Sequence, residues 1–165
     1  RAGILQHEWL NARGAIARFD RDAMEIRVLD IQECPLADIA ICAAIVAVLQ
    51  ALVAERWSLL AQQQAWEVEP LAALLLGTIR QAEQAAIHNE AYLNVFGLAG
   101  IASCTAGELW HHLLSATSML ADTNPWAPAL RHLLRHGPLA RRLLQAVGSE
   151  PARAHLYEVY KRLCT

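Results

Sequence analysis

The sequence predicts a mainly helical chain with one short antiparallel β-hairpin near its N-terminus. Apolar residues recur at helical spacing through most of the chain after residue 35. Before that point, residues 11–30 contain two segments with strand-like alternation and a polar connection. The chain has 165 residues, of which 55% are hydrophobic, which is enough for one domain with a substantial core. We therefore expect a single unit over 1–165, with the hairpin at 11–30 and a helical region at 35–165.

The predicted hairpin joins a strand at 15–19 to a strand at 24–29 through the polar residues 20–23. Successive side chains of a strand point to opposite faces. One face of the second strand comprises Met24, Ile26 and Val28, and the other comprises Glu25, Arg27 and Leu29. We expect the first face to pack on the helix that follows, and the second to line a polar site.

A long helix is predicted over 36–53, with Pro35 in its first turn. A bulky stripe and an alanine stripe run along it, and we expect both to be buried between the hairpin and later helices. These stripes comprise Ile41, Ile45, Val48 and Leu52, and Ala40, Ala44, Ala47 and Ala51. The apolar run 39–54 has sixteen residues, fewer than the roughly 20 that span a bilayer. We therefore expect no membrane partner.

Residues 55–69 read as a connection, and a second long helix is expected from about Pro70 to about Asn89. The segment 92–100 contains two glycines and two aromatic residues, which is typical of a compact loop with aromatic anchors.

Thr105 and Glu108 have the spacing of a capping box, so a helix should start there. Three shorter helices should follow, because caps and breaks punctuate the rest of the chain. These signals are Asn124-Pro125, Gly137-Pro138 and Gly148-Ser149.

Charge is unevenly distributed along the chain. Residues 1–125 carry 7 basic and 14 acidic residues, whereas 126–165 carry 7 basic and 2 acidic ones. The basic C-terminal part lacks interleaved aromatic residues and glycine-rich loops, so a solvated basic face is favoured over a nucleic-acid partner. No CxxC pair is present, which indicates reduced, mostly buried thiols in a cytoplasmic protein. The cysteines are Cys34, Cys42, Cys104 and Cys164.

Most residues that could carry chemistry have a simpler structural interpretation. His132 and His136 are four residues apart near a predicted helix end, where favourable interaction with the helix dipole explains them better than a metal site. His111 and His112 are adjacent and would point about 100° apart on a helix. The chain contains no dinucleotide-binding, phosphate-loop, nucleophile-elbow or zinc pattern.

The charged residues of the hairpin are the best functional candidates. Glu25 and Arg27 project from one strand face in steps of roughly 7 Å. A carboxylate suits a hard divalent cation, and a guanidinium suits phosphate oxygens. Arg13 and Arg18 could add positive charge. The alternative is an exposed sheet face with cross-strand Arg–Glu pairs.

Three segments of the chain resemble one enzyme family, the glutamate–cysteine ligase-like carboxylate–amine ligases, whose fold is related to that of glutamine synthetase. The main segment is AMEIRVLDIQECPLADIAICAAIVAVLQALV, in which a Glu-x-Arg strand precedes an alanine-rich helix. The upstream NARGAIAR resembles a glutamine synthetase pattern of Asn-Arg followed by a further Arg. The tail GPLARRLLQAV…YEVYKRLC resembles the C-terminal end of one branch of the ligase-like family.

The resemblance implies an α+β fragment of a glutamine synthetase-like catalytic domain. It implies that Glu25 coordinates Mg²⁺, that Arg27 faces the substrate or the transferring phosphate, and that Arg13 and Arg18 lie on the nucleotide side. The implied reaction uses ATP to join a carboxylate, with glutamate the first candidate, to an amine through an acyl phosphate. Further metal ligands come from upstream strands in the family, so we expect a piece of a longer protein that is inactive alone.

An alternative is a helical interaction or assembly module on a ligase-like scaffold without chemistry of its own. A chain this apolar, with two long helices, is compatible with that role. Its partner would be the remainder of its own chain, another subunit, or a second copy in a homo-oligomer.

Overall fold

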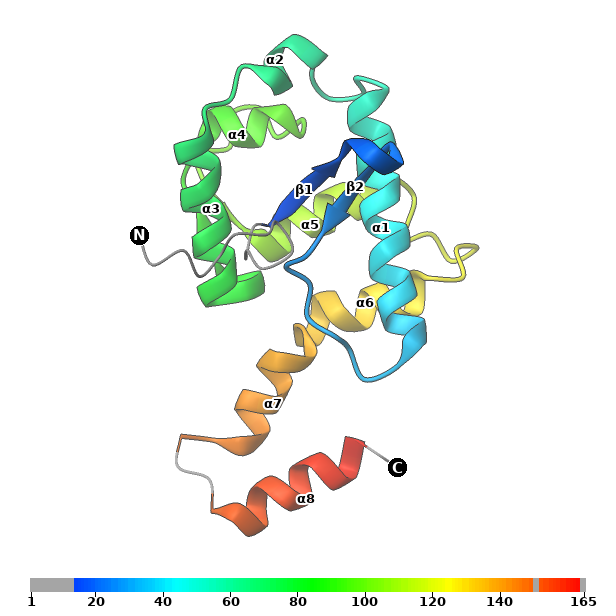
Figure 1. The fold of residues 1–165 in the computed structure, drawn as a ribbon, viewed down its shortest axis with the longest axis vertical. Coiled ribbons are helices and arrows are strands. Elements are labelled where there is room, and N and C mark those ends of the chain that lie inside the picture. Colours follow the sequence, from blue (N-terminus) through cyan, green and yellow to red (C-terminus); the bar gives the residue numbers. More distant parts are fainter. Residues whose placement is uncertain (1–13, 150–151, 164–165) are drawn as a thin grey trace. The chain divides into compact units, whose positions relative to one another are not determined.

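The structure is a computed structural model that describes residues 14–149 and 152–163. It is mainly helical with a short antiparallel β-hairpin near the N-terminus, which confirms the predicted fold class (Figure 1). Its contacts divide the chain into two compact units, Arg1–Ile31 and Gln32–Thr165, which are described here separately.

The first unit contains the hairpin of β1 (Ala15–Arg18) and β2 (Ala23–Ile26). A 3₁₀ turn, η2 (Phe19–Arg21), and the left-handed Asp22 at φ 46° connect the strands. The register pairs Ala15 with Ile26 at one end and Arg18 with Ala23 at the other. β2 is shorter than the predicted strand at 24–29, although the amide of Arg27 still donates to the carbonyl of Gly14 at 3.0 Å.

The burial expected for the apolar face of β2 is wrong. Met24 is 61% exposed, and Ile26 and Val28 are exposed as well. Four-residue strands offer little apolar area, and a two-stranded hairpin alone rarely forms a core. The buried residue of the hairpin is Ile16, which lies opposite Glu25 and therefore shares its face.

The second unit is built mainly from helices (Figure 1). It also contains one small two-stranded sheet. Its elements in chain order are α1 (Pro35–Val53), α2 (Leu60–Gln64), α3 (Val68–Gln81), η3 (Ala82–Gln84), β3 (Ala86–Ile87), α4 (Glu90–Val95), β4 (Cys104–Thr105), α5 (Ala106–Ala116), α6 (Ala127–His136), α7 (Leu139–Val147) and α8 (Arg153–Leu163).

Helix α1 starts at Pro35 as predicted and packs against α5 and α6. Its buried side chains are mainly alanines, because the small stripe lets the neighbouring helices approach closely. The bulky stripe is not buried as expected: Val48 is buried, but Ile41 and Ile45 are only half-buried. The buried residues of α1 are Ala37, Ala40, Ala44, Val48 and Ala51.

Two groups of buried side chains form the core of this unit. The first joins α1, β3, α4 and α5, with Leu93 fully buried and the rings of Trp57, Tyr92 and Phe96 at its edge. The second joins α1 to α5 and α6, where Ala40 and Ala44 meet Leu114, Met119 and Leu130.

The predicted helix from Pro70 to Asn89 is wrong in its second half. α3 ends at Gln81, because Ala82 adopts φ 49° and cannot continue a right-handed helix. η3 and β3 follow, and β3 pairs with β4 through Ala86 and Thr105. A two-residue strand has no detectable period, so the sequence could not reveal this pairing.

The predicted loop at 92–100 contains a helix, α4. The side chain of Asn89 accepts a hydrogen bond from the amide of Tyr92 at 2.9 Å and caps this helix. Tyr92 and Phe96 lie in edge contact, with ring centroids 5.1 Å apart, so the predicted aromatic anchoring holds.

The later helices follow most of the predicted signals. Thr105 and Glu108 form the capping box of α5. α6 starts at Ala127, two residues after the predicted first position Pro125, because Asn124 does not cap the helix but accepts from the amide of Trp126 in a turn before it. Gly137 and Gly148 end α6 and α7 with positive φ, as predicted for breaks.

Two expectations about solvent exposure and length need correction. Cys34 and Cys42 are exposed rather than buried, and Cys104 is half-buried; the three are free thiols.

Within the described residues, α1 is long and apolar enough to cross a membrane by length and composition, with a mean hydropathy of 2.4 over its best window. A core helix of a soluble protein passes the same test.

Candidate functional site

The charged side chains of the hairpin form one connected cluster. Glu25 accepts from both neighbouring guanidiniums: its Oε1 lies 2.7 Å from Nε of Arg27 and its Oε2 lies 3.0 Å from Nη1 of Arg18. Arg18 also donates from Nε to Oδ1 of Asp20 at 3.2 Å. A single carboxylate therefore links arginines from both sides of the hairpin.

The strand register explains why these three side chains meet. Ile16 lies opposite Glu25, and Arg18 is two residues beyond Ile16 on the same face. Arg27 follows Glu25 by two residues and also returns to that face. The expected gathering of Arg18, Glu25 and Arg27 is found. Arg13 lies outside the described residues.

The cluster keeps Glu25 ionised. The hydrogen bond from Arg27 is the largest effect on the pKa of Glu25 and lowers it below its ordinary value; burial opposes this effect, and the hydrogen bond from Arg18 adds to the lowering. A hydrogen bond from Arg18 likewise lowers the pKa of Asp20. The Arg18 and Arg27 side chains are only 18% and 16% exposed, so their guanidiniums are held in place rather than extended into solvent.

The arrangement suits an anion better than a bare cation. Each guanidinium is a planar fork of five N–H donors that matches carboxylate and phosphate oxygens. Both Glu25 oxygens already accept from arginine, so a cation there would share them with two positively charged guanidiniums. In the described part of the chain, no group of three or more His, Cys, Asp or Glu residues could hold a metal. Glu25 fits Mg²⁺ only as one ligand among phosphate oxygens, which is a common way for proteins to hold this ion.

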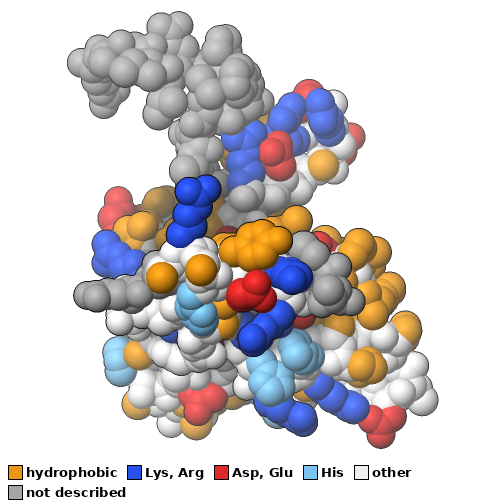
Figure 2. Space-filling model, turned by 90° about the horizontal axis from the view of Figure 1, so that it is seen from below, with side chains coloured by type: hydrophobic (Ala, Val, Ile, Leu, Met, Phe, Trp, Pro, Cys, Tyr) orange, Lys and Arg blue, Asp and Glu red, His pale blue; other side chains and the backbone are white. Residues whose placement is uncertain are grey.

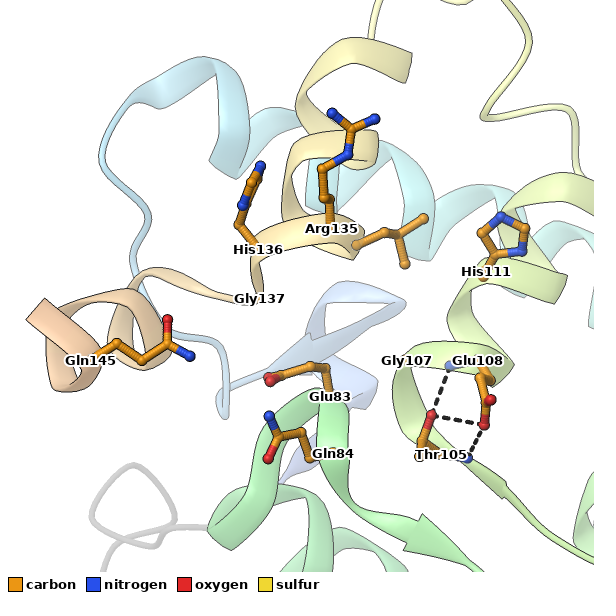
Figure 3. Close-up of a pocket in the computed structure, with 11 residues that line it drawn as sticks. Glu83, Gln84, Thr105, Gly107, Glu108, His111, Arg135, His136, Gly137 and Gln145 are labelled. Atoms are coloured by element: carbon orange, nitrogen blue, oxygen red, sulfur yellow. Dashed lines mark hydrogen bonds between the residues drawn. The ribbon is translucent and has the colours of Figure 1, made fainter.

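A hollow of about 490 Å³ lies in the helical unit, lined by residues of η3, α5, α6 and α7 (Figure 3). Glu83 lies among them, and its Oε1 accepts from Nε of Arg141 at 2.9 Å. Its Oε2 is buried and has no hydrogen-bond partner among the described atoms. No local pattern predicts this ion pair, because Glu83 and Arg141 are 58 residues apart in the sequence.

The two histidines of α6 lie next to each other. The rings of His132 and His136 are in tilted contact, with centroids 4.7 Å apart and an angle of 43° between their planes. Glu33 lies 3.8 Å from His132 and 2.6 Å from Arg142, and the hydrogen bond from Arg142 lowers the pKa of Glu33. The dipole interpretation of the two histidines stays a prediction.

No family model matches the chain, and no solved structure matches it. An uncharacterized protein of Archaeoglobus fulgidus is 50% identical to it over 50 residues, which are 30% of this chain. The matched stretch covers 14% of that protein, so it spans only a small part of the relative's length.

Proposed function

We propose that this chain is part of an ATP-dependent carboxylate–amine ligase, of the glutamate–cysteine ligase-like kind. The observation that carries the proposal is the pair of arginines held on Glu25 at one face of the hairpin, Arg18 at 3.0 Å and Arg27 at 2.7 Å. Fixed guanidiniums of this kind suit phosphate oxygens and the charge that develops during phosphoryl transfer. The Glu-x-Arg strand and the alanine-rich helix after it add the family resemblance.

The proposed reaction has two steps. An oxygen of the donor carboxylate, with glutamate the first candidate, attacks the γ-phosphorus of ATP; the bond to ADP breaks and an acyl phosphate forms. The amine then attacks the acyl carbon, the C–O bond to phosphate breaks, and phosphate leaves with an oxygen of the original carboxylate. The amine proton passes to solvent or phosphate.

The family resemblance supplies the roles that we propose for the three residues. Arg27 neutralises charge on the transferring phosphoryl group, and Arg18 holds phosphate oxygens on the nucleotide side. Glu25 fixes both guanidiniums and would hold Mg²⁺, which supplies further charge neutralisation between phosphate oxygens. These are positioning and electrostatic roles. None of the three acts as a general base in this proposal.

The experiment measures ADP release by the complete protein that carries this chain, with ATP, Mg²⁺, glutamate and a panel of amines. Arg27→Ala should lower kcat at least a hundredfold, because removal of one preorganised charge from a transition state costs about that factor. Arg21→Ala is the matched control, since Arg21 lies on the same hairpin with a 70% exposed side chain. Equal activity of the two variants, or the absence of amine-dependent ADP release, would contradict the proposal.

A second candidate is supported by the surface of α3. No residue of this helix is buried, although it is rich in leucine and isoleucine. Its exposed large side chains are Val68, Leu71, Leu75, Leu76 and Ile79. An exposed apolar helix face is typical of protein interaction sites. This observation favours an assembly module whose partner is another part of its own chain or another subunit.

The two candidates differ in what a polar substitution on α3 does. As an assembly module, the protein should lose its oligomeric or domain contacts on Leu75→Glu, measured by light scattering and limited proteolysis, while it shows no ATP turnover. Arg80→Glu is the control, because Arg80 is an exposed polar residue of the same helix. ATP turnover that depends on Arg27 would reject the module as the sole function.

A further inference from the structure

Helix α1 has a second apolar side besides the one that packs on α5 and α6. Five exposed residues lie on this side, and we call them the outer stripe: Ile39, Cys42, Val46, Leu49 and Val53. Their large apolar side chains are exposed by 38% at Leu49 to 81% at Val53. A helix that is apolar all round is normally buried all round. The outer stripe is therefore the side of α1 that lacks the cover its composition calls for.

The outer stripe has the spacing at which two helices pack side by side. Its residues follow one another in steps of three, four, three and four positions, which is the heptad spacing of a helix-pairing seam. The stripe is centred on Val46, which is seven residues from both Ile39 and Val53. Two antiparallel copies of α1 related by a two-fold axis at Val46 would therefore overlap along the whole stripe.

The exposed area is sufficient for such a pair. Together with Leu36 at the start of the helix, the outer stripe presents roughly 500 Å² per copy, so a pair would remove about 1,000 Å² from water. This total lies at the lower limit for a specific interface and belongs to the weak class, so we expect a dissociation constant in the micromolar range. Figure 2 shows that hydrophobic side chains reach the surface in groups, most plainly on the right of the view.

The charges of α1 favour a second copy over a lipid surface. Asp38 is the one charged residue in the sequence of this helix, and it accepts a hydrogen bond from the amide of Gln32 at 2.9 Å. Helices that lie on membranes carry Lys or Arg on their polar side, and α1 has neither. An antiparallel pair also places the two Asp38 side chains at opposite ends and opposes the two helix dipoles.

We propose that two copies of this chain pair through the outer stripes of α1, antiparallel, with Val46 against Val46 of the partner subunit. Ile39 then packs near Val53 of the partner subunit at each end of the contact. The proposal does not rest on the ligase chemistry or on the exposed side of α3, because it uses no residue of the hairpin or of α3.

Sedimentation equilibrium of the complete protein that carries this chain measures the association. Val46→Glu should raise the dissociation constant at least tenfold, because a charge enters the centre of a dry contact. Ile79→Glu makes the same kind of change at a residue of α3 that is 53% exposed, and it should leave the constant within twofold. A native protein that stays monomeric at high micromolar concentration, or equal constants for the two variants, would overturn the proposal.

Complementary charges test which residues meet. Val46→Lys alone should also dissociate, and a mixture of Val46→Glu with Val46→Lys should associate again, because the two residues face each other across the axis. Recovery in the mixture also shows that both variants are folded. Without recovery, or if the native protein is monomeric and floats with vesicles of phosphatidylcholine and phosphatidylglycerol, the outer stripe serves another partner and the proposal fails.

The direction of the pair has its own test. Ile39→Glu mixed with Val53→Lys should associate at least fivefold more tightly than Ile39→Glu mixed with Ile39→Lys, because antiparallel copies bring residue 39 next to residue 53. The reverse order of affinities is the result for parallel helices and would overturn the proposed geometry.

Discussion

At the scale of single residues, Glu25 is the centre of the hairpin cluster. The sequence allowed Glu25 and Arg27 to be placed on one face, because a strand has a fixed period of two. The same rule placed Arg18 nearby once the register of the hairpin was known. The strand period does not predict that both Glu25 oxygens accept hydrogen bonds from arginines, because these bonds depend on side-chain conformation.

The titration of Glu25 tests this geometry. Arg27 contributes the largest lowering of its pKa, followed among the attractive contacts by Arg18. We expect Arg27→Ala to raise the pKa of Glu25 more than Arg18→Ala does, and Arg21→Ala to leave it unchanged. Carboxyl chemical shifts followed by NMR through the acid range measure all three. A pKa of Glu25 at or above the ordinary glutamate value in the native chain would contradict the cluster.

Glu33 gives a prediction for stability against pH. Its pKa is lowered, first by the hydrogen bond from Arg142, so the folded state favours the ionised form. The stabilisation is therefore present above the ordinary glutamate pKa of about 4.3 and is lost as the pH falls through the lower folded value. For a partly exposed pair we expect Glu33→Gln to cost about 1 kcal/mol or less at pH 7.

Denaturant unfolding of the native chain and of Glu33→Gln between pH 7 and pH 3 measures this difference. The gap between the two should close as the pH falls below about 4. Glu67→Gln is the control, because Glu67 is exposed. A gap that widens in acid would have the wrong sign for a lowered pKa.

At the scale of elements, long periodic helices were predictable and short or irregular elements were not. α1 and α5 were predicted from Pro35 and from the Thr105–Glu108 capping box, which are local signals. The end of α3 depends on the backbone of Ala82, a residue type that normally favours a helix. The pairing of β3 with β4 depends on a contact between distant segments.

The alanine stripe of α1 is the element most sensitive to side-chain size. Ala40 of α1 is fully buried where this helix packs against α5 and α6. Ala40→Leu should destabilise the chain by about 1–3 kcal/mol, because extra methylenes cannot fit into a packed contact. Gln50→Leu on the exposed side of the same helix should change stability by less than about 0.5 kcal/mol. Chemical denaturation compares the two. Equal stabilities would show that the alanine stripe is not closely packed.

At the scale of the whole molecule, the fold class followed from composition and periodicity, but the polar contacts of the helical unit did not. Gln32 is buried, and its Oε1 accepts from the amide of Leu139, 107 residues away. Glu83 and Arg141 are similarly remote in sequence. Such contacts depend on how the helices pack, which no local pattern encodes. For the same reason the hollow lined by residues of η3, α5, α6 and α7 could not be found from the sequence.

The ligase proposal is a statement about the complete protein, and its chemistry leaves an isotopic mark. In a reaction through an acyl phosphate, the phosphate released carries one oxygen from the donor carboxylate. The decisive measurement therefore supplies glutamate labelled with oxygen-18 in its carboxyl groups, together with ATP, Mg²⁺ and the amine. Mass spectrometry of the released phosphate then follows the label. We expect one labelled oxygen per amide formed, and loss of this product in Arg27→Ala but not in Arg21→Ala. Released phosphate without the label would contradict the proposed reaction.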